Sequence, residues 1–278
     1  LALIVLTLSI GAFLCYKGVG TFTTYNHSIA EFLFSADWAP SDSAEGGGSV
    51  GAAIFIFGSV ITCALALAIA TPFSLATAIF MTEISPELGK RFVQPAVEIF
   101  VGIPSVVYGW IGLTILVPLI KNIFNLRFGF SVLAAGIVLA VMIFPTITSL
   151  AADALRSIPK SYRAASYGLG ATRWQTIAKV VVPAAVTGLM TAVILGLARA
   201  FGEALAVAMV IGKMRAFPTS LLSPTNNLTA AIAADMGGAM EGSEYNIALW
   251  TMALMLFIIS LACIFAIHFL TAKGGKQA

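Results

Sequence analysis

Charged side chains are scarce in this sequence. Only 10% of the 278 residues are Asp, Glu, Lys or Arg, whereas 59% are hydrophobic. Soluble domains carry about 25% charged residues, and a soluble core of this length could not bury so much apolar surface. The composition therefore excludes an ordinary water-soluble domain. A lipid bilayer accommodates the same composition, because side chains that face lipid can be apolar as well.

Ligand-binding and catalytic patterns are equally sparse. Cys15, Cys63 and Cys263 lie far apart in apolar runs, and neither they nor the two histidines show metal-ligand spacing. The sequence contains no HExxH motif and no gathered Ser, His and Asp set, which argues against an intramembrane enzyme. It also contains no GxxxxGK motif. We therefore expect no enzymatic activity and no cofactor in this chain, and we expect any driving ATP to be bound by a partner subunit.

Long apolar runs are what the sequence has in abundance. About 20 apolar residues in a helix cross the roughly 30 Å of hydrocarbon in a bilayer. The sequence predicts an all-α, polytopic transmembrane helix bundle of about six spans, at 1–16, 50–82, 92–119, 130–150, 183–212 and 246–270. Within these runs Pro72, Pro104 and Pro145 predict kinks or broken turns. We treat 1–278 as a single transmembrane domain with major loops at 17–49, 151–182 and 213–245.

The distribution of basic residues predicts the orientation. Loops on the cytoplasmic side of a membrane are enriched in Lys and Arg. One side of the predicted bundle carries nine such residues: Lys90, Arg91, Arg156, Lys160, Arg163, Arg173, Lys179, Lys273 and Lys276. The other side carries five: Lys17, Lys121, Arg127, Lys213 and Arg215. We therefore predict that both termini and the loop at 151–182 face the cytoplasm of a bacterial cell, while 17–49 and 213–245 face outward.

The loop at 151–182 holds the most specific motif. Pro159 suits the start of a short helix, and Gly170 can end that helix and turn the chain. Between them lie three small residues, Ala164, Ala165 and Ser166, which would allow another surface to approach closely. Pro183 suits the first turn of the following span.

This motif resembles the EAA loop of bacterial ABC-importer permeases. In that loop Glu-Ala-Ala is followed by three residues and Gly, and nine residues later by Ile-x-Leu-Pro. Ala164-Ala165-Ser166, Gly170 and Val180–Pro183 reproduce these spacings, although Ala164 replaces the glutamate. The resemblance implies that the loop, with Arg163 and Arg173, is a coupling helix that docks into the ATPase subunit. The alternative is an amphipathic helix with its basic face on anionic lipid.

Arg199 is the one basic residue predicted inside a span. A charge at the centre of a bilayer costs at least about 2.5–3.5 kcal/mol, and Glu203 follows four residues later, on the same face of a continuous helix. One interpretation is a self-neutralising pair that helps helices pack. The other, which we favour, is a substrate path in which Arg199 offers forked donors to an anion.

The third span supplies further candidates for the substrate path. Glu98 lies seven residues into the span, and Ser105 and Tyr108 follow Pro104, which leaves a backbone carbonyl unpaired. Ser105 or Tyr108 could contact a polar cargo. Equally, this segment could be a kinked packing helix with Glu98 near the inner interface, and the sequence does not separate the two interpretations.

Residues 102–110, 161–174, 195–207 and 220–234 are together similar to the PstC-type permeases of bacterial phosphate ABC importers. The outer loop with Phe34, Trp38 and Pro40 is more similar to this type than to its sister PstA type. The resemblance covers nearly the whole chain and implies a MetI-like, type I importer permease in the inner (plasma) membrane. It also implies a heterodimer with a PstA-like permease, a dimer of PstB-like ATPases, and a PstS-like phosphate-binding protein outside.

Two alternatives remain open on the residues alone. An arginine suits other oxyanions, such as sulfate or molybdate, as well as it suits phosphate. A regulatory membrane scaffold is a further alternative to a transport subunit. No basic tract with interleaved aromatics indicates binding to nucleic acid.

Overall fold

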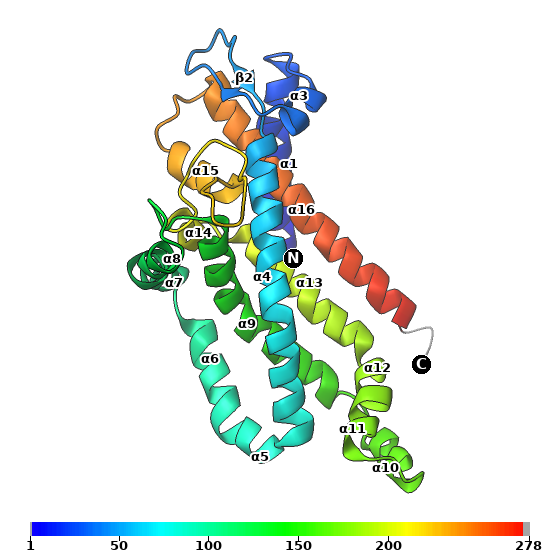
Figure 1. Ribbon diagram of the computed structural model, residues 1–278. Coiled ribbons are helices and arrows are strands. Elements are labelled where there is room, and N and C mark those ends of the chain that lie inside the picture. Colours follow the sequence, from blue (N-terminus) through cyan, green and yellow to red (C-terminus); the bar gives the residue numbers. More distant parts are fainter. Residues whose placement is uncertain (1, 275–278) are drawn as a thin grey trace. The chain divides into compact units, whose positions relative to one another are not determined.

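The computed structural model describes residues 2–274. These residues are mostly helical, and among them lies one two-stranded antiparallel sheet (Figure 1). The elements before the third predicted span are α1 (Ala2–Gly18), α2 (Gly20–Thr23), α3 (Ile29–Phe34), β1 (Trp38–Ala39), β2 (Ser49–Val50), α4 (Ala53–Ile79), the π-helical η1 (Phe80–Ile84), α5 (Pro86–Leu88) and η2 (Gly89–Val93). The middle of the chain forms α6 (Gln94–Gly102), α7 (Ser105–Ile111), η3 (Gly112–Leu116), α8 (Val117–Ile123) and α9 (Val132–Arg156). The remainder forms α10 (Lys160–Gly168), α11 (Arg173–Thr176), η4 (Ile177–Val181), α12 (Val182–Ala184), α13 (Val186–Gly202), α14 (Leu205–Ala208), α15 (Leu228–Asp235) and α16 (Glu244–Gly274).

Within residues 2–274, five helical stretches are long and apolar enough to cross a membrane: Val5–Thr23, Ala53–Ile84, Ser105–Ile123, Val132–Arg156 and Glu244–Phe269. A sixth span is possible if Arg173–Ala184 and Val186–Gly202 are counted together, although a bend of 68° separates them. The predicted all-α bundle of about six spans is therefore confirmed.

Two spans differ from the sequence-based boundaries. The third was predicted over 92–119, but α6 ends at Gly102 and the membrane-length stretch begins only at Ser105. Ile103 adopts an extended conformation (φ −69°, ψ 128°), as expected of a residue that precedes proline. The fifth was predicted over 183–212, but α13 ends at Gly202.

The residues fall into two compact units, which are described separately. The first comprises 1–64, 105–139 and 201–261, and the second comprises 65–104, 140–200 and 262–278. The boundary runs through α4, α9, α13 and α16, so each of these helices contributes residues to both units.

A hydrophobic core organises the segments around β1, β2 and α15 in the first unit. Trp38 on β1 packs edge-on against Phe55 of α4, with 5.1 Å between the ring centroids. Leu228 of α15 and Met252 of α16 are fully buried in the same cluster. The predicted outer loop 17–49 is thus folded onto the helices through α3 and the β1–β2 pair (Figure 1).

Close helix packing in the first unit depends on Gly109 of α7. A Cβ atom at this position would lie 2.9 Å from the Ala206 Cα and 2.7 Å from the Met209 Sδ, which is closer than side chains pack. Glycine therefore permits α7 to lie directly against α14. The same principle operates in the second unit, where a Cβ on Gly188 would lie 2.6 Å from the Ala154 Cβ.

Candidate functional site

The predicted coupling motif forms the short helix α10. Its end is a complete Schellman turn: Gly170 has a φ of +80°, its N–H donates to the Tyr167 carbonyl at 2.9 Å, and the Ala171 N–H donates to the Ser166 carbonyl at 3.2 Å. Glycine is suited to this left-handed conformation because it has no Cβ. The prediction that Gly170 ends the helix is confirmed.

The chain restarts as a helix immediately after this turn. The Thr172 hydroxyl accepts a hydrogen bond from the Gln175 N–H at 3.3 Å, and the Gln175 side chain accepts one from the Thr172 N–H at 2.9 Å. This reciprocal capping box satisfies amide donors that the first turn of a helix leaves unpaired. It fixes where α11 begins, and so places Arg173 directly after the turn.

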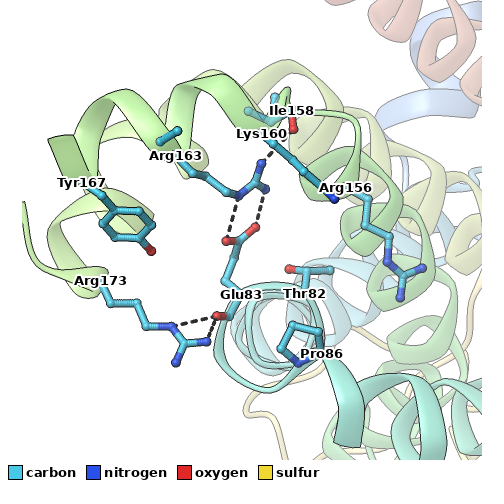
Figure 2. A pocket seen from close by; sticks show the side chains of 10 residues that line it. Thr82, Glu83, Pro86, Arg156, Ile158, Lys160, Arg163, Tyr167 and Arg173 are labelled. Carbon is cyan, nitrogen blue, oxygen red and sulfur yellow. Dashed lines mark hydrogen bonds and ion pairs between the residues drawn. The ribbon is translucent and has the colours of Figure 1, made fainter.

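Arg163 connects α10 to the end of the long α4–η1 helix. Its Nε donates to Glu83 Oε2 at 3.1 Å and its Nη2 donates to Glu83 Oε1 at 2.5 Å (Figure 2). The same guanidinium donates to the carbonyls of Leu155 and Ile158 at 3.0 and 2.8 Å. The Glu83 side chain is only 9% exposed and that of Arg163 only 19%. A two-pronged, mostly desolvated pair of this kind is among the stronger polar contacts in proteins.

Arg173, which follows the Schellman turn, hydrogen-bonds to the backbone of η1. Its Nε donates to the Glu83 carbonyl at 3.0 Å, and its Nη2 donates to the carbonyls of Glu83 and Ile84 (Figure 2). We call the set Glu83, Arg163 and Arg173 the arginine bracket. The hydrogen bond to Glu83 is the main reason that the pKa of Arg163 is raised, although burial opposes it. The Arg163 guanidinium is therefore charged at any physiological pH.

The remaining coupling residues divide between an outer and an inner face. Ala164 and Ala165 are exposed, so another surface could approach them. Ser166 is buried, and its hydroxyl lies 2.9 Å from the Thr176 hydroxyl of α11. Pro183 is exposed and lies in the first turn of the short helix α12, just before the 68° bend that precedes α13.

Arg199 lies within the apolar α13 and is half-buried. Its Nη1 donates to the Thr146 hydroxyl of α9 at 2.7 Å, within the second unit. Thr146 follows Pro145 inside α9. A neutral hydroxyl orients the guanidinium without cancelling its charge.

Glu203 does not share a continuous helix with Arg199, because α13 ends at Gly202. The expectation that both side chains lie on one face of a single helix is therefore wrong. The Glu203 carboxylate accepts a hydrogen bond from the Ala206 N–H at 3.0 Å, and its carbonyl accepts one from the Thr229 hydroxyl at 2.8 Å. Glu203 thus joins the start of α14 to α15 in the first unit.

Ser105 and Tyr108 both belong to α7, which packs on α14 through Gly109. Ser105 is half-buried, whereas Tyr108 is only 7% exposed. In the first unit, therefore, Tyr108 lies on a helix that contacts α14, and Glu203 lies just before α14 and accepts a hydrogen bond from its Ala206 N–H. The structure leaves their predicted role in the substrate path as a prediction.

Glu98 is exposed on α6 and belongs to a polar chain in the second unit. Its Oε1 accepts a hydrogen bond from Gln94 Nε2 at 3.0 Å, and Gln94 Oε1 accepts one from Arg156 Nη2 at 3.1 Å. Arg156 is one of the residues assigned to the cytoplasmic side. This placement favours the inner-interface interpretation of Glu98.

Two polar groupings were missed by sequence reasoning. The sequence shows Glu83 only as one acidic residue in a short charged loop. Ser85-Pro86, which follows it and breaks the helix, was the one signal that Glu83 lies near a helix end. In the outer segments the fully buried Glu244 accepts hydrogen bonds from the Ser41, Gly47 and Gly48 N–H groups at 2.7–3.2 Å, and lies 2.8 Å from His27 Nε2. The Gly46–Gly48 run is typical of a turn, but no feature of the sequence indicated that Glu244 would bind the backbone N–H groups of this turn.

The comparisons with known proteins agree with these features. Residues 70–273 match the family model described as "Binding-protein-dependent transport system inner membrane component". The chain is 51% identical to the Bacillus subtilis "Probable ABC transporter permease protein YqgH", over 98% of this chain and 87% of that protein. It is 37% identical to the Haemophilus influenzae "Phosphate transport system permease protein PstC", over 94% of this chain and 84% of that protein.

The fold is also found among solved structures. A chain of the inward-facing MetNI methionine ABC transporter matches with a TM-score of 0.58 and 22% identity, over 78% of this chain and 96% of that one. At this identity the match shows the fold alone, and it confirms the predicted MetI-like architecture. The chain therefore belongs to the binding-protein-dependent transport system inner membrane components, as a multi-pass permease subunit of an ABC importer.

Proposed function

We propose that this chain is the PstC-type permease subunit of an importer that moves inorganic phosphate into the cytoplasm. The observation that carries the proposal is the extended similarity to proteins named as phosphate transport permeases. That similarity reaches 37% identity in Haemophilus influenzae and 38% in Pasteurella multocida, over 94% and 86% of this chain. The Bacillus subtilis relative is named without a substrate.

The intramembrane chemistry suits an anionic cargo. Arg199 sits in an apolar helix and donates to a neutral hydroxyl, Thr146 Oγ1, so its positive charge is available to a passing anion. Arginine recognises phosphate oxygens through paired donors. Glu203 would limit how tightly an anion is held, and weak binding is needed for release. Ser105 and Tyr108 would contribute polar contacts along the same path.

The proposed assembly supplies the energy from outside this chain. A PstA-like sister permease would complete the channel, and two PstB-like subunits would bind and hydrolyse ATP. A PstS-like protein would deliver phosphate to the outer segments 17–49 and 213–245. Both termini and the α10 loop would face the cytoplasm, as the distribution of Lys and Arg predicts.

The arginine bracket gives the coupling step a physical route. When the ATPase moves α10, the two-pronged contact from Arg163 to Glu83 would pull on η1. Because η1 continues α4 without a break between Ile79 and Phe80, the pull would reach a transmembrane helix. Exposed Ala164 and Ala165 would provide the docking face for the ATPase.

Competition during uptake tests the choice of cargo. Vesicles that contain the assembled complex should take up labelled phosphate only when ATP is present on the ATPase side. Excess unlabelled phosphate should abolish the signal, whereas equal concentrations of sulfate or molybdate should leave most of it. Stronger competition by sulfate or molybdate than by phosphate would agree with a permease but would contradict phosphate as the transported ion.

A further inference from the structure

Two adjoining cavities lie beside the arginine bracket in the second unit. The larger, of about 630 Å³, is lined by Thr82, Glu83, Pro86, Arg156, Ile158, Lys160, Arg163, Ala164, Tyr167 and Arg173 (Figure 2). The smaller, of about 370 Å³, shares Thr82, Pro86 and Arg156 with it and adds Met81, Lys90 and Gln94. Arg156 therefore stands between the two cavities and contributes to both walls.

Positive charge in these walls exceeds negative charge. Glu83 is the single acid among the lining residues, and Arg163 neutralises it directly. Arg156 meets the Asp153 carboxylate at 3.5 Å, and the side chains are 41% and 67% exposed, so solvent screens this pair. Within residues 2–274, neither Lys90 nor Lys160 forms an ion pair within 4.0 Å. Lys90 and Lys160 therefore hold charge that no carboxylate of the described residues pairs with, while the charge of Arg156 is paired only through the exposed contact to Asp153.

We propose that these cavities bind a phosphate group, with Arg156 at the centre and Lys160 and Lys90 on either side. Figure 2 shows Lys160 and Arg156 on the same side of the Glu83–Arg163 pair. A guanidinium presents paired donors to phosphate oxygens, and the two ammonium groups add compact charge. Basic pockets between transmembrane helices on the cytoplasmic side bind anionic lipid headgroups in this way.

Two sources can supply the phosphate group: an anionic phospholipid headgroup or free inorganic phosphate. Large apolar side chains stand exposed on the chain segment that contributes Pro86 and Lys90 to the smaller cavity. Ile84 is 44% exposed, Leu88 49% and Phe92 60%, and they lie on the η1–α5–η2 segment that also carries Lys90. A lipid would place its acyl chains on these side chains while its headgroup reached Arg156, whereas free phosphate would not use them.

The first arm of the test measures lipid selectivity in the assembled complex. Spin-labelled phosphatidylglycerol and spin-labelled phosphatidylcholine are compared in nanodiscs that contain the wild type, Arg156→Gln, Lys160→Gln or Lys179→Gln. Lys179 is exposed on η4 and lines neither cavity, so it controls for the general charge of this face. We expect about a fivefold loss of preference for phosphatidylglycerol with each cavity variant, and little change with Lys179→Gln. Arg156→Lys, which keeps the charge, should retain most of the preference and separates loss of binding from misfolding.

The second arm measures equilibrium binding of radiolabelled inorganic phosphate to the complex in neutral detergent, without the binding protein. Binding that disappears in Arg156→Gln and persists in Lys179→Gln identifies free phosphate as the ligand. Selectivity for phosphatidylglycerol with the same dependence identifies the lipid. The proposal is overturned if neither probe distinguishes Arg156→Gln from Lys179→Gln. The site lies apart from Arg199 in the sequence, and both binding measurements need no ATP. Uptake of phosphate by an unaltered complex would therefore not count as support for this site.

Discussion

Arg163 holds both carboxylate oxygens of Glu83, residues that are 80 positions apart in the chain. The contact ties the short helix α10, which precedes the Schellman turn, to the π-helical end of a transmembrane helix. Arg173 adds hydrogen bonds to the backbone of Glu83 and Ile84. Three segments are thereby held together at one point by charge-assisted hydrogen bonds.

Glu83→Gln should destabilise the protein by about 1.5–3 kcal/mol, because it removes charge-assisted hydrogen bonds from a mostly buried arginine. Thermal unfolding of the detergent-solubilised protein measures this loss. Asp153→Asn is the matched control, since its pair with Arg156 is loose and exposed, and it should change stability by less than about 0.5 kcal/mol. Equal effects of the two variants would contradict a structural bracket.

The bracket should also matter for coupling. In a double-mutant cycle, Glu83→Gln and Arg163→Gln should be strongly non-additive, because each removes the other's partner. In the assembled complex, either variant should lower the amount of phosphate transported per ATP hydrolysed more than it lowers ATP hydrolysis itself. An unchanged amount of phosphate transported per ATP hydrolysed would mean that the bracket stabilises the loop without transmitting motion.

Thr146→Val should impair transport by releasing Arg199 from its hydroxyl acceptor. Loss of one hydrogen bond to a charged donor corresponds to about a tenfold drop in kcat/KM for phosphate. Thr146→Ser keeps the hydroxyl and should restore most of the activity. Thr148→Val is the control, because the Thr148 hydroxyl is buried on the same helix and has no hydrogen-bond partner among the described residues. A similar defect in Thr148→Val would show that packing of α9, and not the Arg199 contact, is responsible.

Gly109→Val should push α7 away from α14. A Cβ at Gly109 already approaches the Ala206 Cα at 2.9 Å, so a branched side chain should cost about 1–3 kcal/mol through overpacking. A lower midpoint of thermal unfolding would report this cost. Gly237→Val, at a position where a Cβ meets nothing within 4 Å, should have little effect on the midpoint, and the comparison fails if both variants behave alike.

The outer His27 cluster predicts a pH dependence of stability. Burial alone would lower the pKa of His27, but hydrogen bonds to Glu244 and Glu31 outweigh it and raise the pKa above 6.5. Only the protonated ring can donate to both carboxylates at once. The stabilisation is therefore full below about pH 6.5 and is lost as the pH rises through the raised pKa of the folded protein. Tyr25 is the other titratable group that senses Glu244, and burial followed by that charge raises its pKa, so it stays neutral throughout this range.

Thermal unfolding from pH 5.5 to 8.5 tests this dependence. The wild type should lose its advantage over His27→Asn as the pH rises, because the neutral ring keeps only one of its two donors. An advantage that grows toward alkaline pH would contradict the assigned direction of the pKa shift.

Local sequence chemistry predicted much of the architecture. The apolar runs predicted a membrane bundle, Pro104 marked the break after α6, and Gly170 marked the turn after α10. Each of these depends on a residue whose backbone preference is nearly independent of its surroundings.

Features that depend on tertiary contacts could not be predicted in this way. Glu83 meets Arg163 only because two segments that are distant in the sequence fold together, and no sequence motif contains both residues. Glu203 lies beyond the end of α13. Because no proline marks that end, the sequence predicted a helix that runs too far. The buried Glu244 required knowledge of which backbone amides in the 41–48 segment would surround it.

In the function proposed here, Arg199 serves the passage of phosphate through this subunit. ATP-dependent uptake of labelled phosphate by vesicles that contain the full complex tests this role, with Arg199→Ala and Arg199→Lys compared with the wild type. We predict that the wild type accumulates phosphate, that Arg199→Ala abolishes uptake while assembly and ATPase docking persist, and that Arg199→Lys retains only part of it. Undiminished uptake in both variants would contradict the claim and leave Arg199 as a packing residue of α13.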